Sequence, residues 1–164
     1  MIVYHGSYLE IPVPDLNYGR FNLDFGRGFY VTTLQQQAEK WAYRRAVMTN
    51  KEAHVSVYEF NADGLDILSF SGYTEDWLDF VVQNRAGTLK VNPYDAIYGN
   101  IADDDVATIV NDYIRLLQKG RISSTGKQFY LEQLQYSKPN NQYCVATPKG
   151  INALLYAECY KLEV

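Results

Sequence analysis

Segments with strand-like and helix-like patterns are mixed along this chain without a regular β-α-β repeat, and this order constrains the fold more than any other feature. Regular alternation would favour a doubly wound parallel sheet, whereas an irregular mixture favours an α+β fold with largely antiparallel strands. The chain has 164 residues, which is near the usual size of one domain. Since no repeat or linker interrupts the sequence, we expect a single domain over residues 1–164.

Hydrophobic periodicity places the expected elements along the chain. Strands are predicted at residues 1–5, 55–60, 65–70, 94–99, 142–147 and 156–164, and residues 6–28 are expected to be an irregular loop. The strands on either side of the turn at 61–64 are expected to form a hairpin. A helix is predicted from Leu34, with Thr33 as its cap and Trp41 packed inward. Further helices are expected from Thr74, from Asp103, over residues 128–136 and after Pro148.

Composition excludes several classes of function. A net charge of −4 argues against a general nucleic-acid binder held by a basic face, although a specific nucleic-acid substrate stays open. The N-terminal residues lack the basic start and apolar core of a signal peptide, and no long apolar run follows, so we expect a cytoplasmic protein without a membrane segment. With 2 cysteines and 2 histidines, a metal site or a disulfide framework is not expected. The motifs of P-loop, serine-hydrolase, zincin and Rossmann enzymes do not occur.

Tyrosine is unusually frequent, with 15 Tyr against 7 Phe. A tyrosine ring packs and stacks like phenylalanine but also forms hydrogen bonds through its hydroxyl group. This composition suits either a half-buried sheet in contact with water or a ligand cleft lined with rings, and it does not choose between them.

Three short blocks carry the remaining chemistry: Y-H-G-S at residues 4–7, F-G-R-G-F-Y at 25–30 and N-Q-Y at 141–143. Their order resembles the ADP-ribosyltransferases of the diphtheria-toxin and poly(ADP-ribose) polymerase type, which carry Y/W-H-G-S/T, F-G-x-G-I/F-Y and N-E-Y blocks. The chain is also similar to a bacterial family of uncharacterised domains with YHGS, FGxGFYxTT and ADD blocks. The resemblance implies an ADP-ribosyltransferase-like α+β fold, in which two small antiparallel sheets pack together with surrounding helices and NAD lies between them.

The resemblance also implies a role for each residue of the blocks. His5, Tyr30 and Gln142 would be the catalytic residues, with His5 bonded to the adenosine ribose and Tyr30 stacked on the nicotinamide. The cofactor-binding residues would be Gly6, Ser7, Gly28 and Trp41, with Trp41 as a second stacking ring. Each ring has a structural alternative: His5 as a satisfied core histidine, Tyr30 as an ordinary strand aromatic and Trp41 as a core residue of its helix.

Two positions depart from the family pattern. Gln142 replaces the catalytic glutamate, and its amide can bond a ribose hydroxyl but cannot pair with an oxocarbenium-like centre. Ala38 stands where the polymerases carry a carboxamide-binding serine. Asp103 and Asp104 are the acidic candidates, since they either cap the following helix or supply the missing carboxylate.

The function implied is therefore NAD-dependent transfer of ADP-ribose to an unknown acceptor, either a protein or a nucleic acid. The alternative is a catalytically impaired module that binds NAD or ADP-ribose and acts through contacts with a partner.

Overall fold

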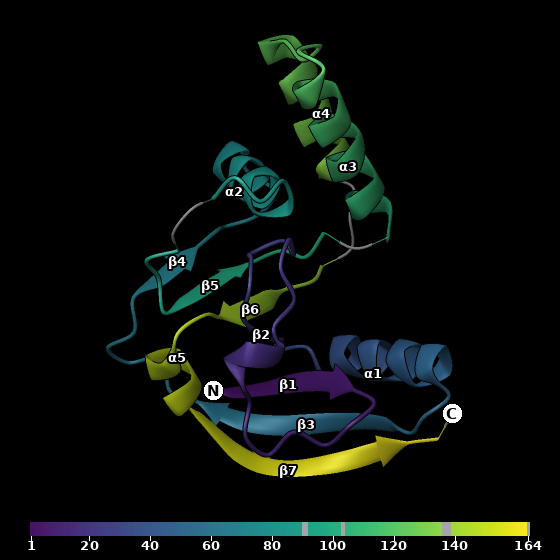
Figure 1. Ribbon diagram of the computed structural model, residues 1–164, viewed down its shortest axis with the longest axis vertical. Helices are drawn as coiled ribbons and strands as arrows, with labels where there is room; N and C mark the ends of the chain where they lie inside the picture. The colour runs from purple at the N-terminus through teal and green to yellow at the C-terminus, as the bar shows by residue number, and fades with distance from the viewer. Residues whose placement is uncertain (90–91, 103, 136–138, 164) are drawn as a thin grey trace.

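The computed structural model describes residues 1–89, 92–102, 104–135 and 139–163 and contains two small β-sheets with flanking helices (Figure 1). The strands are β1 (Ile2–Ser7), β2 (Phe29–Val31), β3 (Ala53–Phe60), β4 (Ile67–Ser69), β5 (Ala96–Gly99), β6 (Gln142–Val145) and β7 (Leu154–Leu162). The helices are α1 (Gln35–Thr49), α2 (Glu75–Arg85), α3 (Asp104–Gln118), α4 (Ser124–Leu134) and α5 (Pro148–Asn152), and a short 3₁₀ turn, η1 (Leu16–Tyr18), precedes β2.

The three-stranded sheet has the order β1-β3-β7 and is antiparallel throughout. The four-stranded sheet has the order β2-β6-β5-β4, in which β4 runs parallel to β5. The α+β class and the two small sheets agree with the sequence prediction, but the expectation that both sheets are antiparallel is wrong for this pair. Helix α2 lies in the connection between β4 and β5, and a parallel pair needs a crossover of this kind.

The predicted hairpin between residues 55–60 and 65–70 is also wrong. Its two strands exist as β3 and β4, but they belong to different sheets. Strand β3 lies between β1 and β7, so both of its edges already form backbone hydrogen bonds. Because no edge of β3 is left, β4 pairs with β5 instead.

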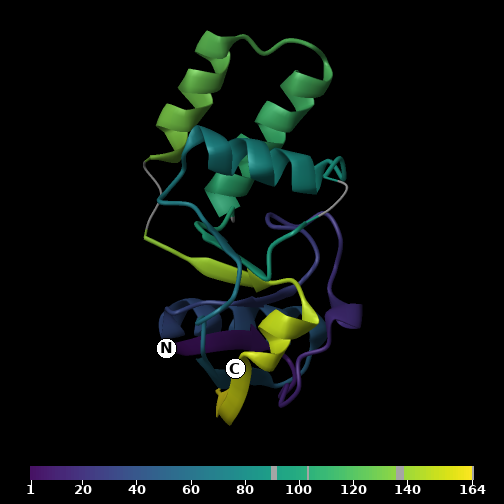
Figure 2. The ribbon, with the colours of Figure 1, turned by 90° about the vertical axis from the view of Figure 1, so that its left-hand side faces the viewer.

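Three apolar clusters fill the space between the layers, and Figure 2 shows the layers from the side, with α1 near one end and α3 and α4 at the other. Helix α1 covers the three-stranded sheet through Ala38, Ala42 and Ala46. The two sheets pack on each other through a cluster that contains Val3, Phe29, Val31, Tyr58 and Phe60. The four-stranded sheet packs against α2, α3 and α4 through Phe25, Trp77, Val81, Val110 and Leu134.

Helix α2 begins at the cap that the sequence predicts, whereas the cap of α5, Thr147, lies within the predicted strand 142–147. The Thr74 hydroxyl accepts a hydrogen bond from the backbone N–H of Trp77 at 3.2 Å and caps α2. The Thr147 side chain caps α5, with Pro148 in the first turn. No helix in the described parts of the chain is both long and apolar enough to cross a lipid bilayer.

Helix α1 differs from the prediction at both its start and its inner face. Thr33 does not cap it, because the Thr33 hydroxyl accepts a hydrogen bond from the Asn141 side chain at 2.8 Å, and the residue before the helix is Leu34. Trp41 is only half-buried, so the expectation that it anchors the helix inward is wrong. Three alanines at helical spacing form the buried face instead, and their small side chains allow α1 to lie close to the sheet.

Candidate active site

His5 joins the first block to the second. Its Nδ1 atom lies 2.7 Å from the backbone oxygen of Tyr30, and its ring stacks on Phe29 with 4.4 Å between ring centroids. A carbonyl oxygen only accepts hydrogen bonds, so Nδ1 must carry the proton. Burial lowers the pKa of His5, although the hydrogen bond to Tyr30 opposes this shift. At neutral pH the ring is therefore uncharged, and its Nε2 atom is a hydrogen-bond acceptor.

Tyr30 points from β2 into the core between the four-stranded sheet and the helices. Its hydroxyl donates to the backbone oxygen of Gly26 at 2.6 Å and accepts from the backbone N–H of Phe25 at 3.1 Å. Burial raises the pKa of Tyr30 well above its usual range, and the nearby Cys144 and Asp24 raise it further. Since the loop backbone occupies the hydroxyl group, only the ring is left to contact a ligand.

Gln142 lies at the start of β6 and is 4% exposed. In the β2–β6 pair Tyr30 is opposite Cys144, and Gln142 is next but one to Cys144 along the strand. Alternate residues of a strand point to the same face, so Gln142 shares a face of the sheet with Tyr30. The structure thus places these two predicted site residues on one face of the four-stranded sheet.

The ring of His5 does not lie on that face. His5 stacks on Phe29, whose ring belongs to the cluster between the two sheets, whereas the ring of Tyr30 belongs to the cluster under the helices. Neighbouring side chains of a strand point in opposite directions, so the His5 and Tyr30 rings lie on different sides of β2. The backbone oxygen of Tyr30 is the link between them.

Two of the three glycines of the blocks, Gly6 and Gly28, are buried where backbones meet. A Cβ atom on Gly6 would lie 1.9 Å from the backbone oxygen of Ala38 in α1. A Cβ atom on Gly28 would lie 2.5 Å from Cys144 Sγ and 2.6 Å from the backbone oxygen of Val145. Both positions therefore require glycine for packing, whatever ligand the protein binds.

Asn141 ties the third block to the residues that directly follow the second block. Its Oδ1 atom accepts from the hydroxyl of Thr32 and from the backbone N–H of Thr33, both at 3.0 Å. Its backbone oxygen accepts from the Gln37 side chain at 2.6 Å. Ser7 is half-buried at the end of β1 and opposite His54, and Trp41 lies on α1.

The sequence reasoning missed Asp24, which lies just before the second block. Its Oδ2 atom accepts from Gln142 Nε2 at 3.3 Å and from the backbone N–H of Ala102 at 2.8 Å. Its Oδ1 atom pairs with Arg85 of α2 at 2.6 Å. No motif marks Asp24 or Arg85, because three distant parts of the chain form this cluster.

The structure places only one of the two acidic candidate residues. Asp103 lies outside the described residues, and Asp104 is the first residue of α3. A carboxylate contribution from either therefore stays a prediction. Among the described residues, no group of three or more histidine, cysteine, aspartate or glutamate side chains is arranged to hold a metal ion.

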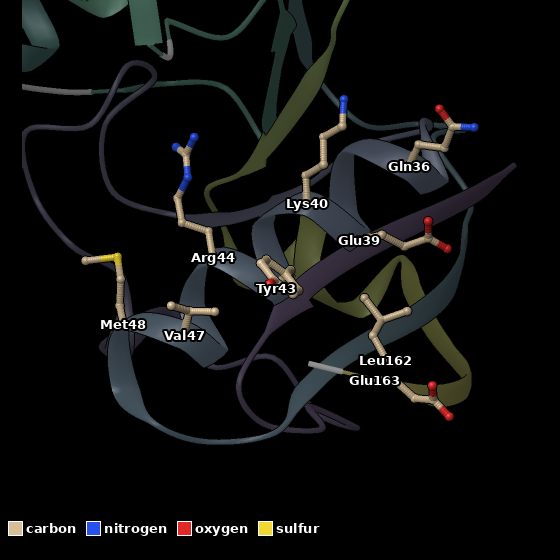
Figure 3. A pocket seen from close by; sticks show the side chains of 9 residues that line it. All are labelled: Gln36, Glu39, Lys40, Tyr43, Arg44, Val47, Met48, Leu162 and Glu163. Carbon is tan, nitrogen blue, oxygen red and sulfur yellow. The ribbon is translucent and has the colours of Figure 1, made fainter.

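Two surface hollows lie away from the three blocks. The larger, of about 840 Å³, is on the outer side of α1 beside the end of β7, where Tyr43, Val47 and Leu162 line it (Figure 3). A smaller one, of about 360 Å³, lies between β4 and α2. Neither His5, Tyr30 nor Gln142 lines either hollow.

Comparison with known proteins places the chain in a family. No match was found among curated proteins or among solved structures. The sequence model of one family, described as "Protein of unknown function (DUF3990)", matches residues 1–156, which include all three blocks. Since this match covers most of the 164 residues, the chain belongs to the DUF3990 family.

Proposed function

We propose that the protein binds NAD where β1, β2 and β6 meet and transfers the ADP-ribose group to an acceptor. The observation that carries this proposal is the meeting of the three blocks: His5 bonds the backbone of Tyr30, and Tyr30 shares a sheet face with Gln142. The same three blocks carry the resemblance to ADP-ribosyltransferases.

The chemistry of His5 supports the proposal. A ribose hydroxyl is a hydrogen-bond donor, and the neutral ring of His5 offers Nε2 as an acceptor. The hydrogen bond from Nδ1 to the Tyr30 oxygen holds the ring at a fixed angle. His5 is thus suited to orient a ribose without carrying charge.

The proposed reaction breaks the bond between the nicotinamide nitrogen and the anomeric carbon of its ribose. The bonding electrons leave with nicotinamide, which becomes neutral, and positive charge develops on the ribose ring. A nucleophilic atom of the acceptor then bonds to the anomeric carbon and releases its proton to solvent. Gln142 would orient a ribose hydroxyl in this step, but its amide adds no negative charge to stabilise the developing cation.

A specific observation favours a second candidate function. The amide of Gln142 stands where the ADP-ribosyltransferases carry a glutamate, and it is already bonded to Asp24 at 3.3 Å. An uncharged side chain with one end occupied suits binding better than stabilisation of a cation. The second candidate is therefore a module that binds NAD or ADP-ribose and acts through a partner.

One experiment tests both candidates. Calorimetric titration with NAD measures binding, and chromatography of the same mixtures measures free nicotinamide. Release of nicotinamide with turnover supports transfer, and binding without release supports the module. Absence of NAD binding would refute both.

Variants show whether the proposed residues are responsible. Gln142→Ala should change either the affinity for NAD or the turnover, whereas Gln133→Ala, on the exposed face of α4, should change neither. Rates measured over a range of NAD concentrations separate kcat from KM. Identical behaviour of Gln142→Ala and the wild-type protein would remove Gln142 from the site.

A further inference from the structure

The amide of Gln142 can face Asp24 in only one orientation. An ionised carboxylate accepts hydrogen bonds and cannot donate them, so the end of the amide beside Asp24 Oδ2 must be the Nε2 group. The Oε1 atom of Gln142 must then point away from Asp24. The hydrogen-bonding chemistry of the pair therefore determines that Oε1, and not Nε2, is the end of the amide that faces away from Asp24.

Asp24 is itself held in place. Arg85 contacts its Oδ1 atom through Nε at 2.8 Å and through Nη2 at 2.6 Å, and the backbone N–H of Ala102 donates to Oδ2 at 2.8 Å. The Asp24 and Arg85 side chains are 13% and 16% exposed. The carboxylate is mostly buried and three donors surround it, so these hydrogen bonds fix its orientation.

We propose that Asp24 is a positioning residue, which holds the Gln142 amide so that its Oε1 atom is presented as an acceptor to a ribose hydroxyl of NAD. This inference rests on the proposed binding of NAD. Asp24 does not touch the substrate in this scheme, since it acts through Gln142. Arg85 in turn fixes Asp24.

The same pair explains why position 142 carries an amide. A glutamate there would place a second carboxylate beside Asp24 Oδ2, where Gln142 Nε2 now lies at 3.3 Å. Two carboxylates at this distance repel each other, and neither can donate a hydrogen bond unless one takes up a proton. Arg85 compensates one negative charge but not two. Glutamine is therefore the residue that fits beside Asp24.

A double-mutant cycle tests the inference. The four proteins are the wild type, Asp24→Asn, Gln142→Glu and the double variant, in which the amide and the carboxylate have exchanged positions. In the double variant the amide at position 24 can donate to the carboxylate at position 142, so the hydrogen bond is restored in reverse. Asp112→Asn is the matched control, because Asp112 pairs with Arg115 on an exposed part of α3.

Two readouts separate the inference from the proposed function. In urea unfolding, which needs no NAD, the double variant should have a higher midpoint than additivity of the two single variants predicts, because contacting residues couple. In NAD turnover, Asp24→Asn should raise KM about tenfold, and Asp112→Asn should leave it unchanged.

Each outcome has a defined meaning. Additive unfolding midpoints would overturn the pairing of Asp24 with Gln142, and so would a midpoint of Gln142→Glu equal to that of the wild type, since this single variant leaves Asp24 and its contacts with Arg85 and Ala102 unchanged in sequence. Turnover by the wild type with an unchanged KM in Asp24→Asn would overturn the positioning role while the proposed function stands. Absence of NAD binding by the wild type, with coupled midpoints, would refute the proposed function and the positioning role but keep the pair.

Discussion

Replacing Gly6 with alanine tests how closely helix α1 approaches strand β1. The added Cβ atom would lie 1.9 Å from the backbone oxygen of Ala38 and 2.7 Å from the backbone nitrogen of Ala42. Both atoms belong to the helix backbone, so no side chain can rotate to make room. The helix must move away from the sheet, and the contacts of Ala38 and Ala42 with β3 weaken together.

The expected magnitude follows from the two opposing effects of the substitution. Overpacking of a core costs roughly 1–3 kcal/mol, and a clash with backbone belongs at the upper end, about 3 kcal/mol. Alanine restricts the unfolded chain more than glycine does, which returns roughly 0.5–1 kcal/mol. The net loss in the free energy of unfolding is then about 2 kcal/mol. For a chain of this size, that loss corresponds to a fall in Tm of about 4–8 °C.

Thermal and urea unfolding followed by circular dichroism measure this loss. Gly126→Ala in α4 is the control, since its added Cβ atom would meet Ser123 Oγ at 3.6 Å and Ile122 Cδ1 at 3.8 Å, which are ordinary contacts, and alanine in a helix is favoured by up to about 1 kcal/mol. A Tm of Gly6→Ala equal to or above that of the wild type would refute the close approach of α1 to β1.

Three further predictions follow from buried groups. Because burial lowers the pKa of His5 below 6.5, the unfolded state takes up a proton first as the pH falls, so the free energy of unfolding should decrease from about pH 7.5 to 5.5. His5→Gln should flatten this decrease, and parallel curves of unfolding free energy against pH for the two proteins would contradict the lowered pKa. Tyr30→Phe leaves the backbone oxygen of Gly26 without its donor and should cost about 1–3 kcal/mol in urea unfolding, whereas an unchanged midpoint would remove the loop-holding role of the hydroxyl. Leu134 is fully buried, so Leu134→Ala should lower the free energy of unfolding by about 2–5 kcal/mol, whereas Leu117→Ala, at a side chain that is 44% exposed, should lower it by roughly 0.5 kcal/mol or less. Equal losses for the two variants in urea unfolding would place Leu134 outside the core.

The candidate site could be predicted only where its residues stand in blocks. The sequence pattern placed His5 on a strand but predicted no strand around Tyr30, and the structure joins β1 to β2 through the hydrogen bond to the Tyr30 oxygen. The contact between Asp24 and Gln142 spans 118 positions, and neither neighbouring sequence contains a pattern that indicates it. A buried polar cluster of this kind depends on which elements meet, so the sequence carries no local signal for it.

The sequence by itself determined the features that depend on neighbouring residues. A threonine hydroxyl caps a helix within its own first turn, so Thr74 could be recognised directly, and Pro148 likewise marks the first turn of α5. The amphipathic pattern of residues 104–118 likewise predicts the helix, since Val106, Val110 and Tyr113 recur at helical spacing and are buried.

The tertiary structure alone decided which strands pair and which side chains meet. Residues 55–60 and 65–70 have the local pattern of a hairpin, but β1 and β7 from the two ends of the chain occupy both edges of β3. The Thr33 hydroxyl has the local pattern of a cap, but Asn141 binds it instead. In both cases a partner distant in sequence replaces the local one, because each strand edge and each hydroxyl can satisfy only a limited number of hydrogen bonds.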